Sequence, residues 1–555
     1  MKRINPSNAL IFFLIGIALC MKGISAIDKQ WDLTKDKRYT LSENTVTAIE
    51  QLESPITIEV LLGGDLPSNY KRLRAELTVF LNQLTRINPF VQYDFINPFA
   101  ENTNTEQTIK DLYSYGLNPE IEIDQENQST AQTVVVPWMI LNMGNKSSRV
   151  GLLQKNLGDT PEGRIEQSIQ QLEYNILDGM HKLLIKKKKR IAVIKSHGTS
   201  EDKKILSFLQ GLQPYYNLAP FDLKALADTP EKTLENLNRF DLLLVSNPKE
   251  IFSNEEKYIF DQYIQQGGNS LFFIDPVAVA QDSLFVLQGD AVVYPVELEL
   301  DELFFKYGVR LNKDIITDLY SAPIVLAQGE NASSEYKPYP WVYHPLVQPT
   351  EDHPIGSAIG NVHHRFTSSI DTLENTLKKT ILLTTSNRSK RKTPPFIIAL
   401  KEATQPLKPS EFNEDGMITA VLLEGEFPSL FANRIAPFAW TAPKAVKSAR
   451  MALFSDGNIA ENQLNSGEPL ELGYDKWTNN LYANKSFLHN TVHYLIGEED
   501  RLNLRSKDIQ LAFLDAAVLN EKRTALRNTA FLTPLILLGL LFLILYLRRK
   551  QQFRQ

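Results

Sequence analysis

Cysteine is nearly absent from this sequence. The single cysteine, Cys20, lies inside an apolar run close to the N-terminus. One cysteine cannot form an intramolecular disulfide, and it cannot supply the ligands of the usual cysteine-based zinc sites. The composition is otherwise that of a folded protein, with 43% hydrophobic and 22% charged residues in 555. This length is enough for about three domains.

An excess of positive charge is also missing. Lysine and arginine total 59 against 65 aspartate and glutamate residues, which gives a formal net charge of −6 and a pI near 5.9. This balance argues against nucleic acid as a partner. The one basic cluster, residues 186–190, closes a helical pattern. We interpret it as a solvated helix end that the helix dipole favours, and a nuclear or nucleic-acid signal is the alternative.

Several motifs of catalysis are missing as well. The chain has no G-x-x-x-x-G-K-[ST] loop, so it does not hydrolyse ATP by that route, and it has no G-x-S-x-G turn. His489 and His493 have the spacing of a metalloprotease helix, but Asn490 stands where the catalytic glutamate would be. His363 and His364 lie in a polar stretch and are interpreted as a surface pair. The sequence therefore predicts no metal and no cofactor.

A long apolar run is present near the C-terminus. Residues 530–547 contain Thr533 as their only polar side chain, and this length is enough to cross a bilayer. A basic tail, residues 548–555, follows at once. Positive charge at one flank marks the cytoplasmic side. We therefore expect a transmembrane helix over residues 530–547 with a cytoplasmic tail.

The N-terminal apolar run is shorter. Lys2 and Arg3 precede 13 apolar residues, 9–21. If Lys22 snorkels, the segment extends to residue 27, so residues 1–27 are predicted to be an uncleaved anchor, with a cleaved signal peptide as the alternative. Positive charges before the first run and after the second predict that both ends are cytoplasmic. The expected protein is a two-pass protein of the bacterial inner (cytoplasmic) membrane with a periplasmic body.

The chain between the two runs divides into four parts. We expect a juxtamembrane stalk and helix over residues 28–54 and an N-terminal α/β domain over residues 55–190. A doubly wound α/β domain with insertions is expected over residues 191–507. Residues 508–529 are charged and have a helical pattern, which predicts a membrane-proximal helix that leads into the second apolar run.

Alternating patterns predict the N-terminal α/β domain and the helix before it. Thr40 and Glu43 have the spacing of a capping box. Residues 56–62 and 91–96 are typical of strands, and the leucine spacing between them predicts a helix, so they form a βαβ unit with a parallel pair. Residues 165–183 predict one long amphipathic helix. Two further strand-like runs cover residues 133–141 and 149–153.

The second domain is predicted to contain a doubly wound parallel sheet. Short apolar strands at residues 191–194, 241–245 and 271–274 alternate with helical patterns. Later strand candidates are residues 381–385, 417–423 and 451–454. The order resembles the class I glutamine-amidotransferase-like fold, but the cysteine nucleophile of those enzymes has no counterpart here. The Pro/Gly-rich stretches 328–359 and 393–416 are expected to be surface insertions.

Polar residues follow the ends of four predicted strands. They are His197, Asn247, Asp275 and Asp456. Open α/β sheets bind ligands at the carboxyl edge of their strands, so these four residues are the candidates for ligand binding. The alternative is that they cap loops and helices.

Five stretches of the sequence resemble one known family. They are WDLTKDKRYTLS, LPSNYKRLRAEL, YDFINP, GGNSLFFIDP and LRSKDIQLAFLD. Over nearly its whole length the chain resembles the GldG family of gliding-motility-associated ABC transporter components from the Bacteroidetes. The family's turn after the first strand of the second domain is Gly-His-Gly-Glu, whereas this chain has Ser196-His197-Gly198-Thr199. A role that needs the whole turn therefore does not carry over.

The resemblance implies an auxiliary, membrane-anchored subunit that works with an ABC permease subunit and an ABC ATPase subunit in gliding motility. It implies that Trp31, Lys37, Arg38 and Tyr39, in the charged stretch after the first apolar run, contact the permease. Together with the missing motifs it predicts a non-enzymatic accessory subunit. The alternative is a periplasmic ligand-binding receptor for a small molecule or glycan at the sheet edge, and a cell-envelope hydrolase is a third hypothesis. No transported substrate follows from the sequence.

Overall fold

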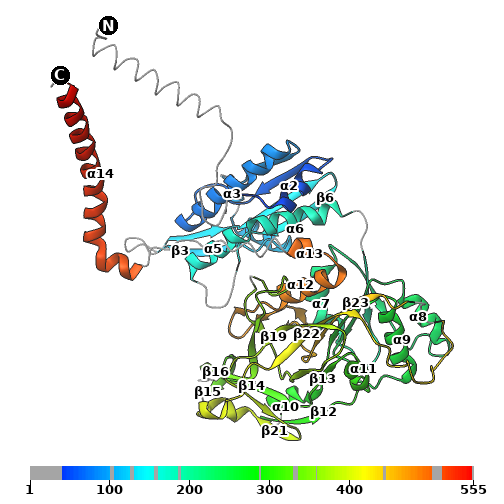
Figure 1. The fold of residues 1–555 in the computed structure, drawn as a ribbon. Coiled ribbons are helices and arrows are strands. Elements are labelled where there is room, and N and C mark those ends of the chain that lie inside the picture. The colour runs from blue at the N-terminus through cyan, green and yellow to red at the C-terminus, as the bar shows by residue number, and fades with distance from the viewer. Residues whose placement is uncertain are drawn as a thin grey trace. The chain divides into compact units, whose positions relative to one another are not determined.

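The structure is a computed structural model of the chain (Figure 1). It describes residues 40–552 apart from 101–104, 125–130, 155–159, 186–188, 287–288, 329–334, 358, 442–444 and 503–515. The described residues belong to two compact units, one within residues 39–507 and one within residues 508–555. The predicted N-terminal anchor, the stalk up to residue 39 and residues 508–515 of the predicted membrane-proximal helix lie outside the described residues.

A four-stranded sheet with the order β2-β1-β5-β6 forms the centre of the N-terminal part. β1 (Ile56–Val60) and β2 (Val91–Phe95) are parallel and α3 (Ser68–Ile87) connects them, which confirms the predicted βαβ unit. β5 (Trp138–Met143) and β6 (Lys146–Gly151) are antiparallel additions to β1. The buried side chains of α3 recur every three or four residues, as an amphipathic helix requires: Tyr70, Leu73, Leu77, Leu81 and Leu84.

The helix before this sheet begins later than predicted. α2 (Glu43–Glu50) has Ser42 as its N-cap, not Thr40. The Ser42 Oγ accepts a hydrogen bond from the Thr45 N–H at 3.1 Å. The sequence contains two hydroxyl residues that could cap this helix, and spacing alone selected the wrong one.

The single helix predicted over residues 165–183 is two helices. α5 (Pro161–Gln170) and α6 (Leu172–Leu184) meet at Gln171, whose φ of −92° and ψ of 0° interrupt the helical geometry. Both helices bury apolar side chains in the same core. Because the apolar pattern continues across the break, periodicity could not reveal it.

Five parallel strands form one half of the main sheet. β7 (Arg190–Ile194), β8 (Asn217–Phe221), β9 (Leu242–Ser246), β10 (Asn269–Phe273) and β23 (Ser448–Phe454) lie in the order β8-β7-β9-β10-β23. In chain order this is 2-1-3-4-5, a doubly wound arrangement whose switch point lies between β7 and β9. The predicted doubly wound sheet is therefore present, with β8 as a strand that the sequence did not predict.

The other half of the main sheet is antiparallel, so the prediction of a wholly parallel sheet is wrong. β22 (Ile418–Glu426) pairs with β23 in the antiparallel direction, and β19 (Lys378–Thr384), β16 (Glu335–Pro349) and β15 (Ser321–Gln328) continue outward from it. The protein is thus a mixed α/β structure with parallel and antiparallel strand pairs. The apolar content of a single strand does not show whether the strand pairs in the parallel or the antiparallel direction.

The stretch 328–359 is not a surface insertion, because β16 crosses it. Trp341, Tyr343 and Val347 on this strand are buried. The strand contains several prolines, which usually argue against a strand in the interior of a sheet. Over residues 335–340, β15 is the only partner strand among the described residues, so one edge of β16 is open there and proline is tolerated.

Helices cover both faces of the parallel half (Figure 1). Alternate residues of each strand enter two separate cores, as the two-residue period of a strand requires. One core is closed by α8 (Pro230–Leu237), α9 (Asn254–Gln265) and α11 (Asp301–Lys306), and the other by α7 (Asp202–Leu212) and α12 (Asn484–Ile496). Helix α9 begins with a capping box of Ser253 and Glu256.

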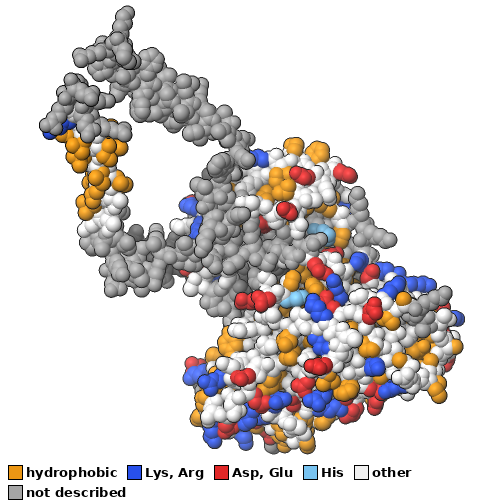
Figure 2. Space-filling view, in the orientation of Figure 1, with side chains coloured by type: hydrophobic (Ala, Val, Ile, Leu, Met, Phe, Trp, Pro, Cys, Tyr) orange, Lys and Arg blue, Asp and Glu red, His pale blue; other side chains and the backbone are white. Residues whose placement is uncertain are grey.

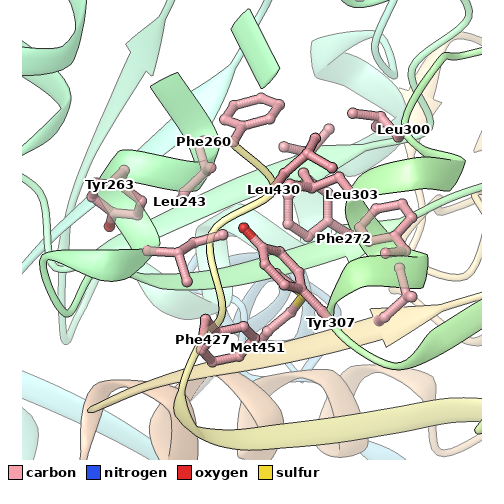
Figure 3. Packing of buried hydrophobic residues seen from close by; sticks show 14 of the residues in the cluster. Leu243, Phe260, Tyr263, Phe272, Leu300, Leu303, Tyr307, Phe427, Leu430 and Met451 are labelled. Atoms are coloured by element: carbon pink, nitrogen blue, oxygen red, sulfur yellow. The ribbon is translucent and has the colours of Figure 1, made fainter. Parts of the chain in front are cut away.

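A buried carboxylate is part of the first core. Figure 3 shows Tyr307 among the apolar side chains of this cluster. Its hydroxyl donates a hydrogen bond to Asp261 at 3.0 Å, and the same carboxylate accepts from the Ser429 hydroxyl at 2.6 Å and the Leu430 N–H at 2.9 Å. Burial raises the pKa of Asp261, and these hydrogen bonds oppose the rise.

We expect Tyr307→Phe to destabilise the body by about 1–3 kcal/mol, because the buried Asp261 carboxylate loses a donor. Tyr263→Phe is the matched control. Its hydroxyl donates to a neutral acceptor, the Phe240 carbonyl, at 3.2 Å, so a loss of about 1 kcal/mol is expected. Urea unfolding of the two variants measures the difference. Equal midpoints for the two variants would contradict this account of Asp261.

The remaining elements are short and surround these sheets. They are α4 (Thr105–Ser114), β3 (Glu120–Asp124), β4 (Ala131–Val135), β11 (Val277–Val279), α10 (Gln281–Val286), β12 (Asp290–Pro295), β13 (Val309–Leu311), β14 (Ile315–Asp318), β17 (Val362–His363), β18 (Ile370–Thr372), β20 (Ser389–Lys392), β21 (Phe396–Ala399), η2 (Leu400–Thr404), η3 (Pro409–Glu411), β24 (Leu464–Asn465), β25 (Glu468–Pro469), β26 (Tyr474–Asp475), β27 (Asn480–Leu481) and α13 (Glu499–Leu502). The predicted insertion 393–416 therefore contains one strand and two 3-10 turns.

The C-terminal unit contains one long helix, α14 (Ala516–Gln552), which continues through Pro534. Within it, Arg527–Leu547 is long and apolar enough to cross a membrane, and it is the one such helix among the described residues. Its apolar side chains are exposed to the surroundings, as the orange column in Figure 2 shows. An exposed apolar helix of this length is what a bilayer-spanning segment requires. The other span of the predicted topology, within residues 1–27, falls in residues that the structure does not describe.

Candidate functional site

The four predicted site residues follow strands of the parallel half. His197 follows β7, Asn247 follows β9, Asp275 follows β10 and Asp456 follows β23. The carboxyl ends of these strands meet at one edge of the sheet, next to the switch point between β7 and β9. His197 and Asn247 both have a positive φ, of 62° and 51°, which is uncommon for residues other than glycine. Strained backbone of this kind is often found at functional sites.

Asn247 and Asp275 belong to one hydrogen-bond network. The Asp275 carboxylate accepts from the Gly457 N–H at 2.5 Å, from the Asn458 Nδ2 at 3.1 Å and from the Lys249 Nζ at 3.2 Å. The Asn247 Nδ2 donates to the Asn458 Oδ1 at 3.1 Å, and the Asn247 Oδ1 accepts from Lys249. Lys249 and Asn458 therefore join two of the predicted residues, although the sequence analysis singled out neither.

Asp456 stabilises this network through hydrogen bonds to its loop. One of its oxygens accepts from the Asn458 N–H at 2.8 Å. The other accepts from the Arg365 N–H at 2.9 Å and lies 3.0 Å from the His364 Nδ1. Asp456 is fully buried and is absent from the lining of the cavity described below. It fixes the loop that presents Asn458.

The protonation of Asp275 is perturbed. Burial raises the pKa of this carboxyl to about 6; the Lys249 ammonium opposes the rise and the Asp456 carboxylate adds to it. A carboxyl with such a pKa changes its charge close to neutral pH, and it lies at the edge of a cavity. Perturbed groups in clefts are candidates for function.

The His197 side chain takes part in a different set of contacts. Its Nε2 lies 3.0 Å from the Glu256 carboxylate and its Nδ1 lies 3.0 Å from the Ser196 hydroxyl. The ring stacks on Phe252 with centroids 4.0 Å apart. Glu256 is also the capping residue of α9, so the imidazole ties the turn after β7 to that helix. The backbone carbonyl of His197, in contrast, accepts from the Lys249 N–H at 2.7 Å and so holds the loop of the network.

A cavity of about 480 Å³ opens at this edge. Its polar side comes from the strand ends, and Asn247, Lys249, Asp275, Asn458 and Glu461 line it. An apolar side comes from the hairpin of β11 and β12 and from nearby aromatic residues: Val277, Ala278, Val279, Tyr294 and Phe366. The cavity has the mixed lining of a small-molecule site. Of the five polar residues named at the strand ends, Lys249, Asn458 and Glu461 were not predicted. Lys249 and Asn458 stand two residues after predicted ones, and that proximity could have identified them.

The cavity lining contains a serine hydroxyl paired with a carboxylate. Ser200 in its lining donates to Glu461 at 2.7 Å. No histidine or cysteine is among the described residues that line the cavity, so the group beside the serine hydroxyl is the Glu461 carboxylate. Among the described residues, no group of three or more histidine, cysteine, aspartate or glutamate side chains could hold a metal ion.

The interpretation of His363 and His364 as a surface pair is wrong. His364 is fully buried, and β17, which contains His363, pairs with β16 inside the fold. The Asn484 side chain accepts from the His363 N–H at 2.9 Å and donates to its carbonyl at 2.8 Å. The polar residues around this pair concealed its position in a sheet. The His489 ring contacts the Phe208 carbonyl at 3.1 Å, and His493 contacts the Tyr216 hydroxyl.

The four residues predicted to contact the permease, Trp31, Lys37, Arg38 and Tyr39, lie outside the described residues. The ligand-binding role of His197, Asn247, Asp275 and Asp456 stays a prediction.

Comparisons with known proteins address the family. A comparison with curated proteins gives no match. Among solved structures the chain is similar to one described as "mmIFT52 N-terminal domain", with 12% identity, a TM-score of 0.32, and coverage of 58% of this chain and 100% of that chain. A family model described as a domain of unknown function (DUF7088) matches residues 35–142. A model of the ABC transporter auxiliary family, described as "ABC-type uncharacterized transport system", matches residues 188–491. Because that match covers more than half of the 555 residues, the chain belongs to this family of ABC transporter auxiliary proteins.

Proposed function

We propose that this auxiliary protein is a membrane-anchored, non-enzymatic accessory subunit of an ABC transporter complex involved in gliding motility. The observation that carries the accessory role is the family match over residues 188–491. The link to gliding motility rests on the resemblance of the five sequence stretches alone. The absence of the nucleotide-binding and nucleophile motifs from the sequence supports a subunit that leaves ATP hydrolysis to a separate ATPase.

The proposed topology has two spans, both ends in the cytoplasm and the body in the periplasm. The exposed apolar helix Arg527–Leu547 supports the second span. The basic residues that flank the two apolar runs support the orientation. In this arrangement, two segments lie next to the periplasmic surface of the membrane, where a permease presents its loops. They are residues 31–39 and the start of α14.

Copurification from mild detergent tests the proposal. The full chain is expressed together with the permease and ATPase subunits of its transporter. Both subunits are expected to stay bound to it during purification. Replacing Lys37, Arg38 and Tyr39 with alanine is expected to weaken permease retention, and Lys408→Ala, at an exposed lysine outside the cavity, serves as the control that leaves it unchanged. Reporter fusions at Lys390 and after Gln555 are expected to report periplasm and cytoplasm respectively. A periplasmic signal at Gln555, or purification of the wild-type chain without the permease, would contradict the proposal.

A ligand-binding receptor is the second candidate, and the polar and apolar cavity of about 480 Å³ at the sheet edge favours it. Native mass spectrometry of the purified chain tests this function. A receptor is expected to retain a small molecule that Asn247→Ala and Lys249→Ala release, whereas a subunit without a ligand gives the mass of the polypeptide alone for each of the three proteins.

A further inference from the structure

Two large aromatic side chains are exposed next to one another, away from the cavity at the sheet edge. Tyr336 of β16 and Trp477 of the turn between β26 and β27 have 66% and 61% of their surfaces exposed. Their ring centroids are 6.5 Å apart and their planes differ by 22°. The two residues are 141 positions apart in the sequence, so the fold brings them together. Exposed Trp and Tyr side chains are enriched at binding sites because they supply large contact areas at low entropic cost.

The turn that carries Trp477 is rigid. The Asp475 carboxylate accepts from the Trp477 N–H at 3.3 Å and from the Thr478 hydroxyl at 2.5 Å. Gln463 binds the same carboxylate at 3.1 Å. The Lys476 ammonium donates to the Leu464 carbonyl at 2.8 Å and lies 5.2 Å from the centroid of the Trp477 ring. Trp477 is therefore held outward by its neighbours and does not need a partner to become ordered.

The surroundings of the two rings are polar and close to neutral. Glu335 and Lys337, on either side of Tyr336, form an ion pair at 3.0 Å. Thr478 and Asn479 follow Trp477, and Asn479 accepts from the Tyr474 hydroxyl at 2.7 Å. A site for single-stranded nucleic acid would need a basic groove along the phosphates, and a protein hot spot would need an apolar ring that excludes water. Among the described residues, neither accompanies these two side chains.

Near-parallel aromatic faces with hydroxyl, amide and carboxylate groups around them match the two kinds of surface on a sugar. The C–H face of a pyranose packs on an aromatic ring, and its equatorial hydroxyls exchange hydrogen bonds with polar side chains. We propose that Tyr336 and Trp477 form a binding platform for a neutral oligosaccharide. This site is separate from the cavity of the second candidate function, and it does not depend on the transporter role.

Calorimetric titration of the full chain with cellohexaose, chitohexaose and maltohexaose tests the platform. The protein is kept in nanodiscs, because a detergent with a sugar headgroup would compete. At least one oligosaccharide is expected to bind, and Trp477→Ala and Tyr336→Ala are each expected to weaken that binding at least about fivefold, which is the effect of removing one stacking side chain. Tyr115→Ala, at another exposed tyrosine, is the control and should leave the affinity unchanged.

Three outcomes would overturn the proposal. The first is that none of the three oligosaccharides binds. The second is binding that both alanine variants retain in full, which would place the sugar elsewhere. The third is loss of permease copurification from Trp477→Ala without oligosaccharide binding by the wild type, which would assign the rings to a protein contact.

Discussion

Replacing Gly457 with alanine is expected to destabilise the body by about 2–5 kcal/mol, the combined effect of overpacking and of a disturbed buried polar group. A Cβ at this position would lie 2.3 Å from the Asn247 Oδ1 and 2.8 Å from the Asp275 Cγ, closer than non-bonded carbon and oxygen atoms approach. Neither side chain can move away at low cost. Asn247 is held by Asn458 and Lys249, and Asp275 accepts from the Gly457 N–H itself.

Gly416→Ala is the matched control. The nearest atom to its Cβ would be the Thr385 carbonyl oxygen at 3.8 Å, which is an ordinary van der Waals distance. Urea unfolding of both variants gives the comparison. Combining Gly457→Ala with Asn247→Ala should recover part of the loss, because the second change removes the atom that the first one meets. Gly457→Ala with the stability of Gly416→Ala would show that the loop after β23 is not packed as described.

The parallel half of the main sheet and its edge could be predicted from the sequence because the information is local. Each strand is a short apolar run followed by a polar residue, and the carboxyl ends of parallel strands meet at the same edge. Asn247 and Asp275 were identified from that rule and lie in one network. The direction of a side chain is not local information. His197 occupies the predicted position, but its imidazole contacts Glu256 and Phe252, because the positive φ at this residue and the packing of α9 determine where the ring lies.

The antiparallel half was predicted only in part: residues 381–385 and 417–423 indicated β19 and β22, whereas β15 and β16 lack clear strand patterns. β16 contains Pro338, Pro340 and Pro345, which are signals for loops in a sequence, and it is a strand because β15, β17 and β19 supply partners along it. The burial of His363 and His364 was missed for the same reason. Their burial depends on the pairing of β17 with β16, and on Asn484 of α12, which lies 121 residues away from His363. Contacts over such distances in the chain cannot be read from spacing.

The burial of the histidines has a consequence for stability in acid. The Nε2 atoms of His344 and His363 are buried and have no hydrogen-bond partner within the described residues. The two rings pack edge to face at 5.2 Å, next to Phe366. Burial lowers the pKa of His344 to about 3, with Arg365 contributing in the same direction. Burial also lowers the pKa of His363 well below its usual value, and His344 adds to that effect.

These shifts determine the sign of the pH dependence. In the unfolded chain a histidine takes up a proton near pH 6.5, whereas the folded His344 stays neutral until about pH 3. The contribution of each buried histidine to the free energy of unfolding is therefore complete above pH 6.5. It is lost as the pH falls from 6.5 toward 3, by up to about 1.4 kcal/mol per pH unit for each histidine. Asp275 acts in the opposite direction. Its pKa of about 6 lies above its usual value of 3.8, so acidification from pH 6 to 3.8 stabilises the folded chain by up to the same amount per unit.

Two histidines outweigh one aspartate, so the body is expected to lose about 1.4 kcal/mol of stability per pH unit from these groups between pH 6 and pH 4. His344→Phe removes one of the two losses and should flatten the dependence, while Asp275→Asn removes the opposing gain and should steepen it. Denaturant midpoints of the wild type and both variants at pH 6, 5 and 4 measure the three slopes. Carboxylates far from these groups titrate alike in the three proteins, so the differences report on His344, Asp275 and the Asp456 carboxylate that interacts with both. Two results would contradict this prediction: equal pH slopes of stability in the three proteins, or a steeper slope for His344→Phe than for Asp275→Asn. Either result would show that the two imidazoles are protonated in the folded state, so that charged histidine is tolerated where β16 and β17 pair.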